Sequence, residues 1–355
     1  MSTVDIAVAD VFTIGVGPWT NSDPVQEVGL FGTVSLSMSL DAGSIVSFDL
    51  SGDSPGARNI DELATDVWLY LSGVVIARCR VISVQQTFGV DGGDTVSVTA
   101  VDYKALMKAR HVQSPLVYSS VGQAQIVWSV IQHAQAQAGG DLGITAGTLD
   151  GGGIDRDRSY LVGENLGDLL ANLSAVINGP WWEVDGNLVL SAHPFSAFPT
   201  QSTPIMLGVT AREMTRSSGA STFANSLIVD GDSGFTEPVS VDDAGIASDP
   251  RGRWERVAGF PSVTQRSTLV EKADGLLQDA RSPIAAWSCD IDATRFITDA
   301  AYRPGDFVRI VVPSTIVALL GVPEYSVSGQ VMSVTLTIAA SGETTVAVEC
   351  VEVPA

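Results

Sequence analysis

The sequence predicts an α+β fold that is predominantly β, in which two related β-barrel units flank an α/β middle region. Three observations predict it. A segment near the N-terminus recurs near the C-terminus, the residues between the copies change to a helical period, and the composition is that of folded domains. Of the 355 residues, 45% are hydrophobic and 17% are charged, which is enough apolar material for packed cores. A chain this long usually divides into two or three domains, and we place them at residues 1–110, 111–205 and 206–355.

The recurring segment is the strongest internal signal. Residues 80–102 align without a gap with residues 330–352, and nine of the 23 positions are identical. Each copy is typical of a β-hairpin, with two runs of β-branched residues around a turn that contains glycine. Upstream, residues 43–48 resemble residues 305–310, and each is expected to be a turn that leads into a strand. We interpret this as a duplicated β-unit; the alternative is that two valine-rich hairpins look alike by composition.

Helical periodicity appears between the copies. Residues 120–138 and 164–177 each carry an apolar stripe at a spacing of three or four, and each is followed by glycine, which favours amphipathic helices that end there. Residues 181–190 predict a short hairpin around an Asp-Gly turn. A third helix, roughly residues 267–281, is expected inside the second β-unit.

Alternation with period two separates the strands into an apolar and a polar face. The polar faces must meet water, either in the lumen of an assembly or on its outside, and both remain open. Their side chains are short hydroxyls and carboxylates. The candidate channel-lining residues are Ser35, Ser37, Ser39, Thr95, Ser97, Thr99, Asp290, Asp292, Ser333, Thr335 and Thr337.

A different pattern occurs at residues 316–322, an apolar run inside an expected insertion of the second unit. Exposed apolar loops often mark interfaces, so this run predicts a contact with a neighbouring subunit or another protein of the same assembly. The alternative is a local plug of the core. The candidate interface residues are Ile316, Val317, Leu319 and Leu320.

The chemistry-bearing residues do not combine into a site. Carboxylate pairs such as Asp155 with Asp157, or Asp290 with Asp292, are expected by chance in a chain with 40 acidic residues, although paired carboxylates can hydrolyse glycosides. No phosphate-binding loop or nucleophile elbow is present. The three cysteines and three histidines are scattered, so we expect buried free thiols and no metal site. The sequence therefore predicts no enzyme and no cofactor.

The acidity of the chain also limits its partners. The net charge is −21, and each of the three expected domains contributes to it. Such a surface repels phosphate, which argues against nucleic-acid binding. No secretory signal and no apolar run long enough for a membrane helix is found, so we expect a chain folded in a cytoplasm without a membrane anchor.

Several segments of the chain resemble the minor tail proteins of siphophages from actinobacteria, the tail-tip hub family. The similar segments are residues 102–106, 123–145, 158–160, 163–165, 169–170, 177–179 and 303–306. The resemblance implies a baseplate hub at the virion tail tip, assembled in the host cytoplasm, in which a homotrimer carries two tail-tube-like barrels per subunit. The implied partners are the distal tail and other minor tail proteins, the tape measure protein, and phage DNA that passes through without specific binding.

Two other functions stay open. The aromatic pair Trp181-Trp182 and the carboxylate pairs leave a carbohydrate-binding or glycan-hydrolysing tail protein as the alternative, although a core or interface anchor is the simpler interpretation of the tryptophans. A tail-tube or connector protein would share the barrel, but it should contain one unit per chain. Some relatives continue into fibre or peptidoglycan-degrading segments, and here we expect such activities on other proteins.

Overall fold

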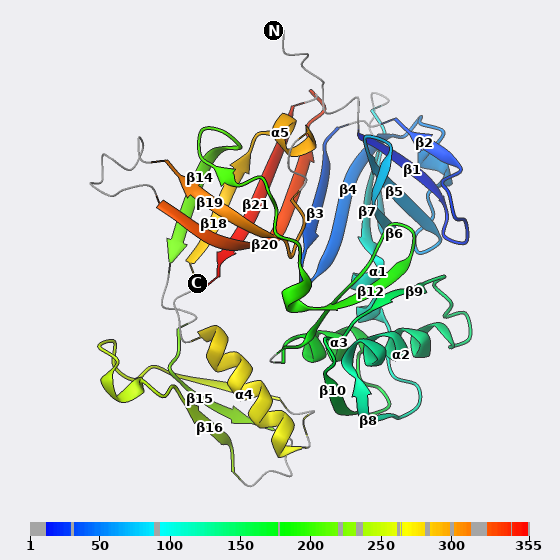
Figure 1. Cartoon of the computed structure of the whole chain (residues 1–355). Helices are drawn as coiled ribbons and strands as arrows, with labels where there is room; N and C mark the ends of the chain where they lie inside the picture. Colours follow the sequence, from blue (N-terminus) through cyan, green and yellow to red (C-terminus); the bar gives the residue numbers. More distant parts are fainter. Residues whose placement is uncertain are drawn as a thin grey trace.

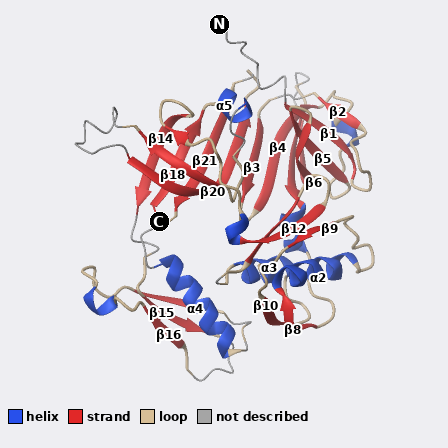
Figure 2. Cartoon of the chain, in the orientation of Figure 1, coloured by secondary structure: helices blue, strands red, loops and turns tan. Residues whose placement is uncertain are grey.

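Strands dominate the computed structural model, which describes most of the chain (Figures 1 and 2). The described residues are 12–29, 32–88, 93–176, 178–218, 223–231, 237–260, 263, 265–280, 285–298, 302–313, 325–341 and 343–353.

One long sheet of 13 strands holds both β-units. The first unit supplies β1 (Phe12–Pro18), β2 (Gln26–Val28), β3 (Val34–Ser39), β4 (Gly43–Ser51), β5 (Thr65–Leu71), β6 (Val74–Thr87) and β7 (Thr95–Asp102). The second supplies β13 (Ile205–Met206), β14 (Ala211–Ser218), β18 (Ala285–Ile291), β19 (Phe307–Val312), β20 (Tyr325–Ile338) and β21 (Thr344–Glu352).

The two units have the same strand order. In the first, the order is β3-β4-β7-β6-β5, and in the second it is β14-β18-β21-β20-β19. The matched strands also follow the same order along the chain, and neighbours within each unit are antiparallel in both. Similar hairpins with unrelated ancestry would not also carry the same set of neighbouring strands.

The pairing register of the repeated hairpins is identical. Val84 lies opposite Val98 in the β6–β7 hairpin, and Val334 lies opposite Val348 in the β20–β21 hairpin, 250 positions later. A β-bulge interrupts each hairpin at the same place, just before this valine pair. Because a one-residue slip would turn every side chain to the other face, the shared register confirms that the two hairpins are equivalent strands.

The second resemblance, between residues 43–48 and 305–310, does not hold at the level of topology. Residues 43–48 lie in β4, which pairs with β7, whereas residues 307–310 lie in β19, which pairs with β20. By strand order the counterpart of β4 is β18, and the counterpart of β19 is β5. A turn that leads into a strand is a local signal, but the partner of a strand is decided by distant residues.

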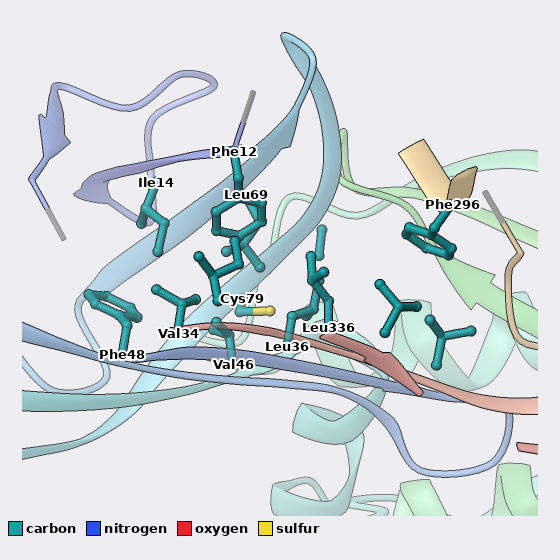
Figure 3. Packing of buried hydrophobic residues seen from close by; sticks show 14 of the residues in the cluster. Phe12, Ile14, Val34, Leu36, Val46, Phe48, Leu69, Cys79, Phe296 and Leu336 are labelled. Carbon is teal, nitrogen blue, oxygen red and sulfur yellow. The ribbon is translucent and has the colours of Figure 1, made fainter. Parts of the chain in front are cut away.

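The prediction of a predominantly β fold with an α/β middle region is confirmed, and the structure adds how the units join. β20 of the second unit pairs with β3 of the first, with Leu336 opposite Leu36. One hydrophobic core therefore contains residues of both units. Figure 3 shows Val34, Leu36, Val46 and Phe48 beneath the curled part of the sheet, facing Phe12, Ile14, Leu69 and Cys79, with Leu336 beside them.

The middle region packs below the long sheet in the view of Figure 1. Its elements are α1 (Tyr103–Leu106), β8 (Leu116–Gly122), α2 (Gln123–Gln135), β9 (Thr145–Leu149), β10 (Asp155–Tyr160), α3 (Leu166–Ser174), β11 (Pro180–Val184) and β12 (Val189–Pro194). Both predicted helices are present, shorter at each end than expected. The Asn165 side chain accepts the Asp168 backbone N–H at 3.1 Å and so caps α3. The helices bury their apolar stripes in a core of this region.

Residues 223–280 form a compact insertion between β14 and β18. The expected third helix is α4 (Arg266–Ala280), and it packs on a small sheet of β15 (Ser226–Asp230), β16 (Val239–Asp242) and β17 (Glu255–Gly259) that the sequence did not predict. This insertion has a core of its own. Its strands are only four or five residues long, which is too short to establish a period that would have revealed them. After β18 the chain forms α5 (Ala293–Thr298) and returns to the long sheet.

None of the helices among the described residues is long and apolar enough to cross a membrane.

Candidate functional site

The hydroxyl-bearing side chains of both units gather on one side of the long sheet. Directly opposite residues in antiparallel strands share a face, and the register places Thr337, Ser35, Ser47 and Thr99 in one row across four strands. The predicted residues on this side, hereafter the polar face, are Ser35, Ser37, Ser39, Thr95, Ser97, Thr99, Asp290, Ser333, Thr335 and Thr337.

The register adds residues to the polar face that sequence reasoning missed. They continue the same rows into β4, β14, β18 and β21, where the same alternation of polar and apolar residues was available as a signal. They are Ser47, Asp49, Ser51, Glu213, Thr215, Ser217, Ser288, Thr345 and Glu349. Ile45, Ala286 and Ala347 interrupt these rows, and none of the residues named in them is lysine or arginine. Outside these rows the register places Arg80 of β6 and Arg309 of β19 on the same side of the sheet. Arg80 is 7% exposed and pairs with Asp66, whereas Arg309 is exposed.

Neighbouring side chains on the polar face satisfy one another. The Ser97 hydroxyl donates to Asp49 at 2.6 Å, and the Ser333 hydroxyl donates to Glu349 at 2.9 Å. Each hydrogen bond engages one oxygen of the carboxylate, and Asp49 is half-buried whereas Glu349 is exposed. The face therefore carries negative charge on short, ordered side chains.

Asp292 is not part of the polar face. β18 ends one residue earlier, and a bulge in β14 shifts the pairing there. The Asp292 carboxylate accepts the backbone N–H groups of Thr294 and Arg295, both at 3.1 Å, and pairs with Arg212 at 3.0 Å. The alternation that placed Asp292 beside Asp290 fails because the chain turns into α5. The candidate interface residues Ile316, Val317, Leu319 and Leu320 lie outside the described residues.

The carboxylate pairs each have separate structural roles. Asp157 accepts the backbone N–H of Ser120 at 2.7 Å, and Asp185 accepts two backbone N–H groups of its own turn. Burial raises the pKa of Glu183, but its neighbour Asp185 is engaged in the turn. No metal-binding cluster of histidine, cysteine and carboxylates occurs in the described part of the chain.

Trp182 is buried and Trp181 is half-buried, and both line a cavity at the junction of the β-units with the middle region. Trp182 is 3% exposed and belongs to the core of the middle region. The Trp181 ring stacks on His193 and lies 4.3 Å from the Phe198 ring, which in turn contacts Phe307 of β19. Trp181 thus joins the middle region to the second unit, as the anchor interpretation predicts.

This cavity, of about 260 Å³, lies where the two β-units meet the middle region. Lys104 reaches into this junction, and its ammonium donates to the carbonyl oxygens of Leu40 at 2.6 Å and Trp182 at 3.1 Å. Burial lowers the pKa of Lys104. These hydrogen bonds connect the residue after β3 to β11. An ammonium group that donates to two backbone carbonyls is not positioned to act as a catalytic base.

The three cysteines are free and buried, as the sequence predicted. Burial raises the pKa of Cys289 to about 12 and raises the pKa values of Cys79 and Cys350 as well. A thiol that stays protonated is a poor nucleophile and ligand.

The whole arrangement recurs in solved structures. A tail protein from Neisseria meningitidis MC58 matches with a TM-score of 0.67 and 10% identity, over 96% of this chain and 97% of that one. The chain has the fold of phage tail proteins. The 43 kDa tail protein of prophage MuSo2 from Shewanella oneidensis matches with a TM-score of 0.67 at 12% identity, over 96% of this chain and 97% of that one.

A third tail protein extends the likeness to another bacterial group. The prophage tail protein gp18 from Listeria monocytogenes EGD-e matches with a TM-score of 0.59 at 11% identity, over 96% of this chain and 94% of that one. No protein-family model and no curated protein matches the sequence. At these identities the shared property is the tail-protein fold.

Proposed function

We propose that this chain is a structural subunit of a phage tail tip, a baseplate hub in which three copies surround a channel for DNA. The observation that carries the proposal is the pair of β-units with one strand order and one register, joined in a single sheet. The likeness to tail proteins over 96% of the chain supports the same role.

The repeat answers a problem of symmetry. Three copies with two similar units each present six similar docking surfaces around one axis. Such a ring can abut a six-fold tail tube on one side and a three-fold tip on the other. The expected partners are the distal tail and other minor tail proteins together with the tape measure protein, in a virion tail assembled in the host cytoplasm.

The polar face is the proposed lining of the channel. DNA must pass without adhesion, and each lysine or arginine in contact with phosphate would add attraction. Glu213 lies directly opposite Asp290, and like charges in that position cost stability. The presence of two acidic residues in this unfavourable arrangement supports a function for their negative charge, namely the repulsion of phosphate.

The use of the acidic groups supports a structural role for the chain. In the pairs considered above, Asp157, Asp185 and Asp292 cap backbone groups, and Asp290 lies out on the polar face. Glu183 and Asp185 both line the cavity at the junction, but the Asp185 carboxylate accepts two backbone N–H groups of its turn, which leaves the pair without the two free carboxyl groups that glycoside hydrolysis needs.

Native mass spectrometry of the purified chain tests the proposal. We expect a complex of three copies. A complex of six copies, or a chain that remains monomeric at all concentrations, would contradict it.

A further inference from the structure

One side of β6 is open where its counterpart is occupied. β6 pairs with β5 through residues 74–80 and with β7 through residues 79–87. On the side of β5, residues 82–87 therefore have no partner strand among the described residues, although the Val84 backbone N–H donates to the Glu62 carboxylate at 3.0 Å, a contact that a neighbouring strand would replace. In β20 the equivalent stretch, beyond the same bulge, pairs with β3.

β14 also has one edge without a partner strand among the described residues. It is the counterpart of β3, because each is the neighbour of the strand next to the repeated hairpin. β3 has β4 on one side and β20 on the other. β14 has β18 on one side and, in the part of the chain that the structure describes, ends the sheet on the other.

We propose that β14 of one copy pairs with β6 of the next copy, in the antiparallel register that β3 and β20 use within the chain. This inference rests on the ring of the proposed function and names its interface. Gln85 is the counterpart of Thr335, and Ser217 is the counterpart of Ser37. Because Thr335 lies opposite Ser37 within the chain, the proposed register places Gln85 opposite Ser217 of the neighbouring copy. In the same way Thr337 opposite Ser35 becomes Thr87 opposite Thr215.

Exposed apolar side chains support this partner. Phe88 is 75% exposed, whereas its counterpart Ile338 is 4% exposed and lies opposite Val34. The proposed register places Phe88 opposite Met214 of the next copy. Removing an exposed phenylalanine from water is favourable, so the contact favours assembly.

The open edges are more polar than the closed junction. Leu336 lies opposite Leu36 in the chain, but the corresponding pair between copies is Gln86 and Arg216. Arg216 already pairs with Glu352 at 2.7 Å, so its charge is compensated before assembly. Polar and charged residues on an unpaired edge disfavour non-specific pairing with other strands. Such residues are expected on an edge that is exposed in the single chain and pairs only on assembly.

The pairing also continues the polar face across the boundary. Ser217, Thr215, Gln85 and Thr87 lie in the rows of the polar face on both sides of the new junction. Each copy contributes the path β14-β18-β21-β20-β3-β4-β7-β6, and joining its two ends repeatedly produces one closed sheet with one lining.

Disulfide cross-linking of the full chain tests the pairing. Opposite residues in antiparallel strands have the Cα separation that a disulfide needs. The double variant Gln85→Cys with Ser217→Cys should form disulfides between copies under mild oxidation, giving covalent dimers and trimers on a non-reducing gel. The native thiols are buried and should not interfere.

Two matched variants serve as controls. Ser37→Cys with Thr335→Cys occupies the equivalent pair inside the chain and should close within one copy, with loss of both introduced thiols and no covalent dimer or trimer on the gel. Gln86→Cys with Ser217→Cys puts the thiols on opposite faces and should give less than a tenth of the intermolecular product.

The outcomes separate this inference from the proposed function. A trimer by native mass in which the Gln85→Cys, Ser217→Cys variant does not cross-link, while the internal control does, would overturn the β14–β6 pairing and leave the ring standing. A chain that stays monomeric and forms no cross-link would overturn both.

Discussion

The Thr335 hydroxyl donates to the Ser37 hydroxyl at 3.3 Å, although the two residues are 298 positions apart in the chain. This contact lies at the junction where β20 meets β3 and the two β-units become one sheet. Beneath it, on the apolar face, the leucines of the same strands are buried. The junction decides whether the chain behaves as one body or as two units on a linker.

Shortening a buried leucine at the junction should destabilise the whole fold. Leu336 is 2% exposed and lies opposite Leu36, and Leu336→Ala removes apolar contacts and leaves a cavity. We expect a loss of about 2–5 kcal/mol in the free energy of unfolding, measured by urea denaturation. Ser35→Ala on the polar face of the same junction is the control and should change stability by about 0.5 kcal/mol or less. Equal effects of the two variants would contradict a shared core.

Asp66 should be indispensable to the first unit. Its carboxylate accepts from Arg78 at 2.7 Å, from Arg80 at 2.5 Å and from the Tyr103 hydroxyl at 2.6 Å, and Asp66 itself is fully buried. Asp66→Asn leaves two buried guanidinium groups without their counter-charge and should cost about 3–5 kcal/mol. Tyr103→Phe removes the hydrogen bond that the hydroxyl donates to Asp66 and the one that it accepts from Arg80, and it should cost at least about 1.5–3 kcal/mol. A neutral outcome for Asp66→Asn in thermal or chemical unfolding would refute this role.

Phe88→Asp should impair assembly without unfolding the monomer. The side chain is 75% exposed in the single chain, so its removal costs little there, while a carboxylate would disfavour the apolar contact between copies. We expect at least a tenfold weaker association by analytical ultracentrifugation and an unchanged unfolding midpoint. Val117→Asp, at a side chain 73% exposed on the middle region, should leave association unchanged. Equal weakening by both variants would argue against the β6 edge.

Positive charge on the polar face should make the ring adhere to DNA. Asp49 in β4 and Asp290 in β18 occupy equivalent positions of the two units, since Asp49 lies opposite Ser97 and Asp290 opposite Ala347, which is 250 positions beyond Ser97. The double variant Asp49→Lys, Asp290→Lys should bind duplex DNA with an affinity that falls as salt rises. Asp155→Lys, on the exposed surface of β10, should bind at least tenfold more weakly. DNA binding by the unmodified chain would contradict a repelling surface.

Lys272 should make a contribution to stability that rises with pH in the alkaline range, whereas the three buried thiols, whose pKa values burial raises, make stability fall as the pH passes the usual thiol pKa. The Lys272 contribution is therefore measured as the difference between the unmodified chain and Lys272→Met. Burial lowers the pKa of Lys272 to about 8 from 10.5, so between these values this group binds more protons in the unfolded chain than in the native one, and its contribution increases with pH. We expect a gain of roughly 1–3 kcal/mol across the window, from about 1.4 kcal/mol per pKa unit reduced by partial solvation. Lys272→Met should abolish the gain. An identical pH dependence of the two proteins in chemical unfolding would contradict the assignment.

The sequence predicted those features that recur or alternate. The gap-free repeat implied equivalent hairpins because register and face follow directly from period two. Ten of the eleven polar-face candidates share one side for the same reason. Asp292 does not lie on the polar face, because β14 has a bulge there and α5 begins at the next residue. The pattern of apolar residues predicts neither feature.

The sequence did not predict which distant segments pair as neighbouring strands. The resemblance of residues 43–48 to residues 305–310 was real as a local turn and strand, but the neighbours of those strands are set by residues far away in the chain. The junction of β3 with β20 was likewise unpredicted, because alternation identifies the buried face of a strand and not the strand beside it. The small sheet under α4 was missed since its strands are too short to establish a period.

A three-dimensional reconstruction of the assembled protein tests the central claim most directly. We predict three copies in a closed ring, with β14 of each copy paired to β6 of the next and with Asp49, Asp290 and the hydroxyl rows of the polar face directed into the lumen. A ring with a different number of copies, or a lumen lined by lysine and arginine while the polar face is covered by other proteins, would contradict it.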